Sequence, residues 1–109
     1  MNQTNIVLSN GELSLQIDPL RVKKSAMVIR ALNHKLRQQM IKLIDEVKTI
    51  TVTDIYVRLR LEQSVASQHL AVLRKVGIVA TKRDGKKIFY SVNYHRLQHI
   101  LNTSNNLLN

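Results

Sequence analysis

The sequence contains no cysteine, and this absence excludes disulfide bonds, thiolate metal sites and a cysteine nucleophile together. It also has no tryptophan, and aromatic residues make up only 4% of the chain. A core must therefore be built from Leu, Ile, Val, Met and Ala, which favours a mainly helical fold. No apolar run approaches the roughly 18 residues of a membrane helix, and the N-terminus lacks the features of a secretory signal. We expect a soluble cytoplasmic protein.

Acidic residues are scarce as well, since 7 Asp and Glu stand against 17 Lys and Arg, giving a net charge of +10. Residues 1–20 contain only Glu12 and Asp18, so residues 21–109 carry a net charge of +12, from 17 basic and 5 acidic side chains. Such a charge attracts polyanions, with nucleic acid as the first choice and an anionic membrane surface as the second. A basic charge that serves only solubility is the alternative.

Motifs for catalysis are missing. The chain has no Gly-rich phosphate loop, no G-x-S-x-G and no H-E-x-x-H, and its few carboxylates are too scattered to form a catalytic dyad. We expect no enzymatic activity and no cofactor.

A chain of 109 residues is long enough for one domain with a modest core. Residues 1–17 are rich in Asn, Gln, Ser and Thr, which predicts a flexible N-terminal arm. Residues 18–105 are expected to form the folded domain, and residues 106–109 a short tail.

Two helices are predicted first. Asp18-Pro19 is typical of a helix start, and Val22, Ala26, Ile29 and Leu32 follow at helical spacing, which predicts a helix over residues 19–32. Asn33 can cap a second helix over residues 34–47. Both apolar stripes are expected to face the core.

The middle of the chain predicts a helix-turn-helix. A very short strand between Lys48 and Val52 leads into a third helix, capped at Thr51 and ending near Leu59. Residues 60–63 would form the turn. A fourth helix begins at Ser64, and Gly77 stops it.

The next segment predicts a hairpin, because Asp84-Gly85 lies between two runs rich in β-branched and aromatic residues. Asn93 can cap a last helix over residues 94–104. These elements amount to about five helices and a two-stranded β-hairpin wing. They predict a mainly α (α+β) fold, the winged helix-turn-helix.

The fourth helix presents a polar face. Ser64, Ser67, Gln68 and Ala71 lie at i, i+3, i+4 and i+7, and hydroxyl and amide groups can read base edges in the major groove of double-stranded DNA. Six cations are candidates for phosphate contacts: Arg74 and Lys75 on this helix, and Lys82, Arg83, Lys86 and Lys87 on the wing. A solvated first helical turn is the alternative explanation of the serines and Gln68.

Three segments resemble the ArsR/SmtB family of bacterial winged-helix repressors. They are ALNHKLRQQMIKLI, with Arg37 at the family's usual arginine, SVASQHLAVLRKVGIV, and the wing KRDGKKIFYSV. The resemblance implies a homodimer, paired through its first and last helices, that binds a palindromic operator and is released by a signal. It also implies that Gln63, Ser64, Ser67 and Gln68 contact bases or nearby phosphates. The family's glycine in the turn is missing here, with Arg60 nearby.

The metal sites of that family are not expected in this chain. The segment TDIYVRLR lacks the cysteines of many relatives, and Tyr94, Arg96 and Leu107 stand at the positions of the Asp and His ligands of others. His95 and His99, four residues apart, could supply half a site, but exposed helix polar residues explain the pair. His69 is expected to be a partly buried core histidine, and His34 to lie in the cap region of the second helix.

The sequence thus predicts a dimeric repressor that binds double-stranded DNA, with no membrane partner, and it identifies no inducer. A basic module that binds polyanions or membrane surfaces without sequence specificity is the alternative function.

Overall fold

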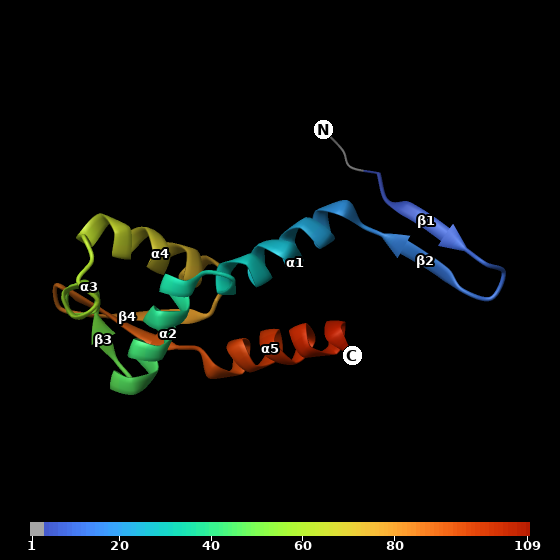
Figure 1. The fold of residues 1–109 in the computed structure, drawn as a ribbon. Coiled ribbons are helices and arrows are strands. Elements are labelled where there is room, and N and C mark those ends of the chain that lie inside the picture. The colour runs from blue at the N-terminus through green and yellow to red at the C-terminus, as the bar shows by residue number, and fades with distance from the viewer. Residues whose placement is uncertain (1–3) are drawn as a thin grey trace.

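The computed structural model describes residues 4–109 (Figure 1). Its helices are α1 (Pro19–Leu32), α2 (Lys35–Val47), α3 (Val52–Arg58), α4 (Gln63–Lys75) and α5 (Tyr94–Leu108). Strands β1 (Ile6–Ser9) and β2 (Ser14–Ile17) form one antiparallel sheet, and β3 (Ile50–Thr51), β4 (Val79–Asp84) and β5 (Lys87–Val92) form another in the order β3-β5-β4. The helices and the β4–β5 hairpin confirm the predicted winged helix-turn-helix.

Side-chain caps fix most helix starts where the sequence predicted them. Asp18 Oδ1 accepts hydrogen bonds from two backbone N–H groups of the first turn of α1, with Pro19 as its first residue. Thr51 Oγ1 accepts the N–H of Asp54, at 3.3 Å, and Asn93 Oδ1 accepts the N–H of Arg96, at 3.2 Å. The caps at Thr51 and Asn93 are therefore confirmed.

Helix α2 begins differently from the prediction. Asn33 ends α1 instead, because its backbone N–H donates to the carbonyl oxygens of Ile29 and Arg30. His34 has the extended backbone that an N-cap requires, and its Nδ1 accepts the N–H of Leu36 at 3.1 Å. The Asn33 cap was wrong, and the placement of His34 in the cap region is confirmed.

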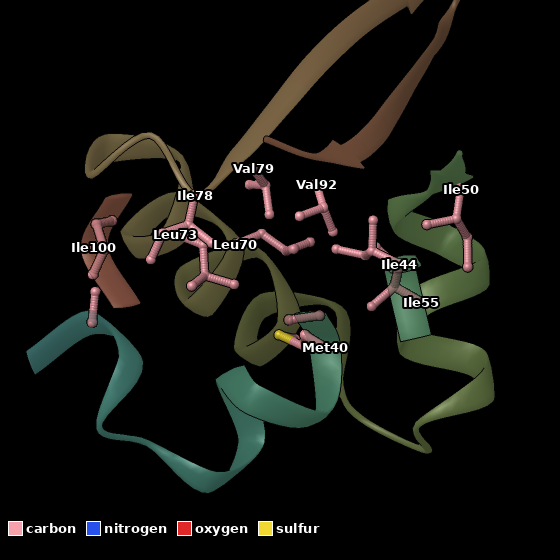
Figure 2. Packing of buried hydrophobic residues seen from close by; sticks show 12 residues of the cluster. Met40, Ile44, Ile50, Ile55, Leu70, Leu73, Ile78, Val79, Val92 and Ile100 are labelled. Atoms are coloured by element: carbon pink, nitrogen blue, oxygen red, sulfur yellow. The ribbon is translucent and has the colours of Figure 1, made fainter. Parts of the chain in front are cut away.

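The core lies where the helices meet the base of the wing. Its largest fully buried side chains come from α2, β3, α3, α4 and the residue before β4: Met40, Ile44, Ile50, Ile55, Leu70, Leu73 and Ile78. In Figure 2, Leu70, Leu73 and Ile78 lie in one cluster with Val79 and Val92 of the wing, where α4 meets its base. The wing is therefore anchored to α4 at its base, and only its outer half extends into solvent.

The apolar stripe predicted for α1 does not face this core. Ala31 is the one buried residue of α1, with Val28 and Leu32 partly buried against the core. Val22 is 57% exposed and Ile29 is 37% exposed. The prediction was wrong for this face, because only the C-terminal end of α1 contacts the body while the rest extends beyond it.

Residues 6–17 form a hairpin where the sequence predicted a flexible arm without regular structure. Strand pairs Ile6–Ile17 and Leu8–Leu15 define its register, and Gly11 in the connecting loop has a φ of +93°. We call residues 6–17 the arm. Its flexibility relative to the winged helix stays a prediction.

The C-terminal end differs too, because α5 continues to Leu108 through most of the segment expected to be a tail. In Figure 1, α1 and α5 both extend away from the winged helix, and the arm continues beyond the start of α1. The radius of gyration is 17.7 Å, against about 13 Å for a compact domain of 100 residues. These projecting elements expose surface that a compact monomer would bury.

Candidate nucleic-acid interface

Helix α4 separates an apolar face from a polar one. Ala66, Leu70 and Leu73 are fully buried on one side. On the other side, every side chain that the sequence nominated is exposed: Gln63, Ser64, Ser67, Gln68, Arg74 and Lys75. The helix begins at Gln63, one residue earlier than expected, and Glu62 makes no side-chain cap. The structure thus brings these six residues to one exposed helix face, and their contact with DNA stays a prediction.

The polar side chains of this face are not held by other side chains. In residues 4–109, hydrogen bonds between side chains involve only two groups, Arg37 with His69 and Asp45 with Lys48 and Tyr94. Within the same range the one salt bridge joins Lys48 to Asp45. The serine hydroxyls, the glutamine amides and the cations of α4 are therefore free to bind a partner without breaking an internal ion pair.

The wing carries its four cations on exposed positions around a tight turn. Asp84 pairs with Lys87, so the two-residue turn is Gly85-Lys86, one residue later than the sequence suggested. Gly85 has a φ of +63°, which a turn of this type requires at its first position. The turn therefore depends on glycine at this position.

The cations do not share one face of the wing. The register pairs Lys82 with Phe89 and Asp84 with Lys87, which places Lys82 and Lys87 on one face and Arg83 on the other. Lys86 lies in the turn itself. The wing can therefore contact phosphates with its tip and with both faces, which the sequence alone did not distinguish.

The arrangement places α4 and the wing tip at the same end of the molecule. Figure 1 shows the start of α4, helix α3 and the β4–β5 turn together at the left of the view. Between Arg58 and Lys87 the chain has eight basic and two acidic side chains, a local net charge of +6. This end of the molecule has the charge and the exposed polar groups that a DNA duplex requires.

Arg37 positions α4, although the sequence assigned it no role. Its Nε donates to the carbonyl oxygen of Ala31 at 2.7 Å, and Nη2 donates to that of Arg30 at 3.2 Å. Its Nη1 lies 3.1 Å from Nδ1 of His69, on α4. One guanidinium therefore joins the end of α1, the first turn of α2 and the recognition-helix candidate.

His69 is half-buried, as the sequence predicted. Its ring centroid lies 4.5 Å from that of His34. Burial lowers the pKa of His69 below its ordinary value near 6.5, and the neighbouring His34 and Arg37 lower this pKa further. The neutral ring can accept the hydrogen bond from Arg37, whereas a protonated ring could not.

The turn between α3 and α4 uses arginine in place of glycine. Arg60 has a φ of 55°, in the left-handed region that a glycine occupies without strain. Its backbone N–H donates to the carbonyl oxygen of Val57. The helix-turn-helix therefore forms without the missing glycine, at a cost in backbone strain.

The other end of α4 is held by a residue from α5. Arg96 Nε donates to the carbonyl oxygen of Val76 at 3.0 Å, and the Arg96 side chain lies against Gly77, where φ is +81°. The sequence treated Arg96 only as a lost metal ligand. Its role in joining α5 to α4 was missed, because hydrogen bonds to a backbone carbonyl leave no sequence pattern.

No metal centre forms in the described part of the chain. In residues 4–109 no three His, Cys, Asp or Glu side chains come together in a group that could hold an ion. His95 and His99 are both exposed on α5. Tyr94 donates its hydroxyl to Asp45 at 2.5 Å and thereby joins the start of α5 to the end of α2.

A helix-turn-helix, a basic wing and an unpaired polar helix face together define a winged-helix DNA-binding protein. Comparisons with known proteins give the family. The profile described as "Bacterial regulatory protein, arsR family" matches residues 34–81. A biofilm growth-associated repressor of Agrobacterium fabrum is 32% identical over 76% of this chain and 70% of that protein.

Two further relatives are similar over most of their length. The transcriptional activator HlyU of Vibrio cholerae is 29% identical over 78% of each chain. The crystal structure of the transcriptional repressor PagR of Bacillus anthracis matches with a TM-score of 0.62 and 28% identity, over 84% of this chain and 100% of that one. The chain belongs to the ArsR family of bacterial regulatory proteins, and it is a DNA-binding transcriptional regulator.

This family consists of transcriptional regulators rather than enzymes. None of the helices in residues 4–109 combines the length and the apolar character that crossing a membrane requires.

Proposed function

We propose that the protein is a homodimeric repressor that binds a palindromic operator in the bacterial cytoplasm. The observation that carries the proposal is the exposed, unpaired polar face of α4 next to a basic wing. A helix of this kind fits the major groove with its first residues at the base edges. Two of the three relatives described above are named repressors, and one is named an activator.

The dimer would form through α1 and α5. Besides Tyr94, these helices expose seven large apolar side chains, distributed on both sides of α1 and along α5. We call them the outer apolar surface: Leu20, Val22, Met27, Ile29, Leu101, Leu107 and Leu108. Exposed apolar patches of this kind mark protein–protein interfaces. Two-fold symmetry would place the two α4 helices about 34–36 Å apart, one turn of DNA, and so explains a palindromic site.

The contacts with DNA would be of two kinds, contacts to base edges that recognise sequence and contacts to phosphates that position the protein. Ser67 and Gln68 would bond to base edges, where the Gln68 amide matches the N6 and N7 groups of adenine. Gln63 and Ser64, at the start of α4, would contact bases or nearby phosphates. Arg74, Lys75 and the four wing cations would bind phosphates, which fix position without reading sequence.

Variants of the two classes test this division on the duplex that the wild-type protein enriches from a randomised library. Gln68→Ala or Ser67→Ala should weaken binding to that duplex by about 1–3 kcal/mol, with little effect on unrelated DNA. Lys86→Ala should weaken binding to both duplexes alike and reduce the dependence of affinity on salt by about one phosphate contact. Equal effects of both classes on both duplexes would show that α4 does not read sequence.

The direction of regulation has its own assay. Transcription in vitro from a promoter that overlaps the enriched site should fall as the protein is added, because a bound dimer occupies the DNA that polymerase needs. A rise in transcript would identify an activator instead.

A further inference from the structure

The arm has one apolar face and one mixed face. The register of β1 and β2 places Ile6, Leu8, Leu15 and Ile17 together on one face, and Val7, Ser9, Ser14 and Gln16 on the other. Every residue of both strands is exposed, and the four aliphatic side chains of the first face are 40–56% exposed. We call these four residues the apolar arm face.

Such a hairpin needs a surface to cover it. A two-stranded hairpin alone is only marginally stable in water, and three or more strands or a packed partner are needed for a stable sheet. Strand residues of the arm include no Lys, Arg, Asp, Glu or Pro, the residues that usually keep a sheet edge from pairing. The apolar arm face and the free edges thus both favour association.

The charge of the arm indicates which partner covers its apolar face. Residues 4–18 carry only Glu12 and Asp18 as charged side chains, whereas the remainder of the chain carries a net charge of +12. DNA and anionic membranes would be repelled by this acidic segment, and a second copy of the protein would attract it. That copy exposes Arg21, Lys23 and Lys24 on the first turns of α1, beside its outer apolar surface.

The size of a stable dimer interface also indicates that a second copy of the protein covers the apolar arm face. A stable interface uses about 20–30 residues from each partner. Helices α1 and α5 contain 14 and 15 residues, of which about half can face a partner, since each helix also faces its own chain. About half of the twelve residues of the arm lie on its docking face, and they would bring the interface to about 20 residues, the lower end of the usual range. The arm also lies immediately before α1 in the chain, because only Asp18 separates Ile17 from Pro19.

We propose that the arm is an intermolecular clasp: its apolar face docks on the second protomer of the dimer and extends the interface of α1 and α5. This proposal rests on the proposed function, because it requires the homodimer. It assigns residues 6–17 to dimerisation and leaves α4 and the wing to bind DNA.

Adjacent substitutions on opposite faces of β1 provide the test. Leu8→Asp places a carboxylate on the apolar arm face, and Val7→Asp places the same charge one residue away on the other face. Sedimentation equilibrium on the full chain should show that Leu8→Asp raises the dimer dissociation constant by about tenfold or more, because it buries an unpaired charge. Val7→Asp should change this constant by less than about threefold.

The outcomes separate this proposal from the one before it. A wild-type dimer that binds an inverted repeat, together with equal dissociation constants for Leu8→Asp and Val7→Asp, would overturn the clasp and leave the proposed function intact. A wild-type protein that stays monomeric at micromolar concentration would contradict both.

A second measurement needs no disruptive substitution. The chain has no cysteine, so Ser9→Cys, on the face away from Leu8, gives a single site for a nitroxide spin label. Mixed dimers of spin-labelled protein and ¹⁵N-labelled protein report contacts between protomers only. Attenuated amide signals in the ¹⁵N protomer, on its helices or on its own arm, would support docking on the second copy. Signals without attenuation would overturn it.

Discussion

Arg37→Ala tests whether one side chain holds α4 in place. The guanidinium makes two part-buried contacts, with the Ala31 carbonyl oxygen and with Nδ1 of His69, and an exposed one with the Arg30 carbonyl oxygen. Hydrogen bonds from a charged donor contribute about 1.5–3 kcal/mol each when they are not fully solvated. Counting only the two part-buried contacts, the substitution should lower the free energy of unfolding by about 3 kcal/mol.

Urea denaturation at a fixed protein concentration measures this change, since the stability of a dimer depends on concentration. Arg37→Lys keeps the charge, but a lysine cannot donate hydrogen bonds to the acceptors on α1 and α4 at the same time. It should therefore recover less than half of the lost free energy of unfolding. Lys35→Ala, an exposed change in the same helical turn, should stay within about 0.5 kcal/mol of wild type. An Arg37→Ala protein as stable as Lys35→Ala would refute the positioning role.

Two further predictions follow from the backbone and from protonation. Arg60→Gly should raise the free energy of unfolding by up to about 1 kcal/mol in the same assay, because φ is 55° there, whereas Arg58→Gly, in the last turn of α3, should lower it by about 0.5–1 kcal/mol. Destabilisation by both would disprove the strain at Arg60. The pKa of His69 is lowered in the folded state, so its contribution to stability is present above about pH 6.5 and is lost as the pH falls below that value. Urea midpoints measured from about pH 7.5 to about pH 5.5 should fall less for His69→Gln than for wild type, and parallel curves would contradict this assignment.

Local signals made the winged helix predictable. Thr51, Asn93 and Asp18 each cap a helix with their own side chain, and the glycines at 77 and 85 have the positive φ that their turns require. These effects depend on a few neighbouring residues, so a single sequence contains them. The apolar face of α4 was equally readable, because its burial follows helical periodicity.

The arm could have been found from the sequence but was not. Ile6 and Leu8, and Leu15 and Ile17, alternate with other residues as strands do, and Asn10-Gly11 between them is a hairpin signal. The surrounding Asn, Ser and Gln residues favoured a loop instead. The prediction that Val22 and Ile29 face the core was wrong for a different reason. Periodicity shows that a helix has an apolar face, but it does not show what covers that face.

The contacts that position α4 could not be predicted from the sequence. Arg37 and Arg96 bond to carbonyl oxygens of the backbone, which every residue supplies. Only the folded structure shows which backbone carbonyl groups at a helix end lie close enough to accept a hydrogen bond from these side chains. The base contacts of Ser67 and Gln68 stay a prediction for a similar reason. They depend on the sequence of the DNA partner, which the protein sequence does not specify.

In the proposed function, a dimer binds a specific DNA sequence through α4. A binding selection from duplexes with a randomised centre, at about 150 mM salt, tests it most directly, since weaker ionic conditions would favour contacts to phosphate alone. We predict enrichment of an inverted repeat whose half-sites are centred about one turn of DNA apart. Binding without any enriched sequence, which disappears as salt is raised, would contradict it.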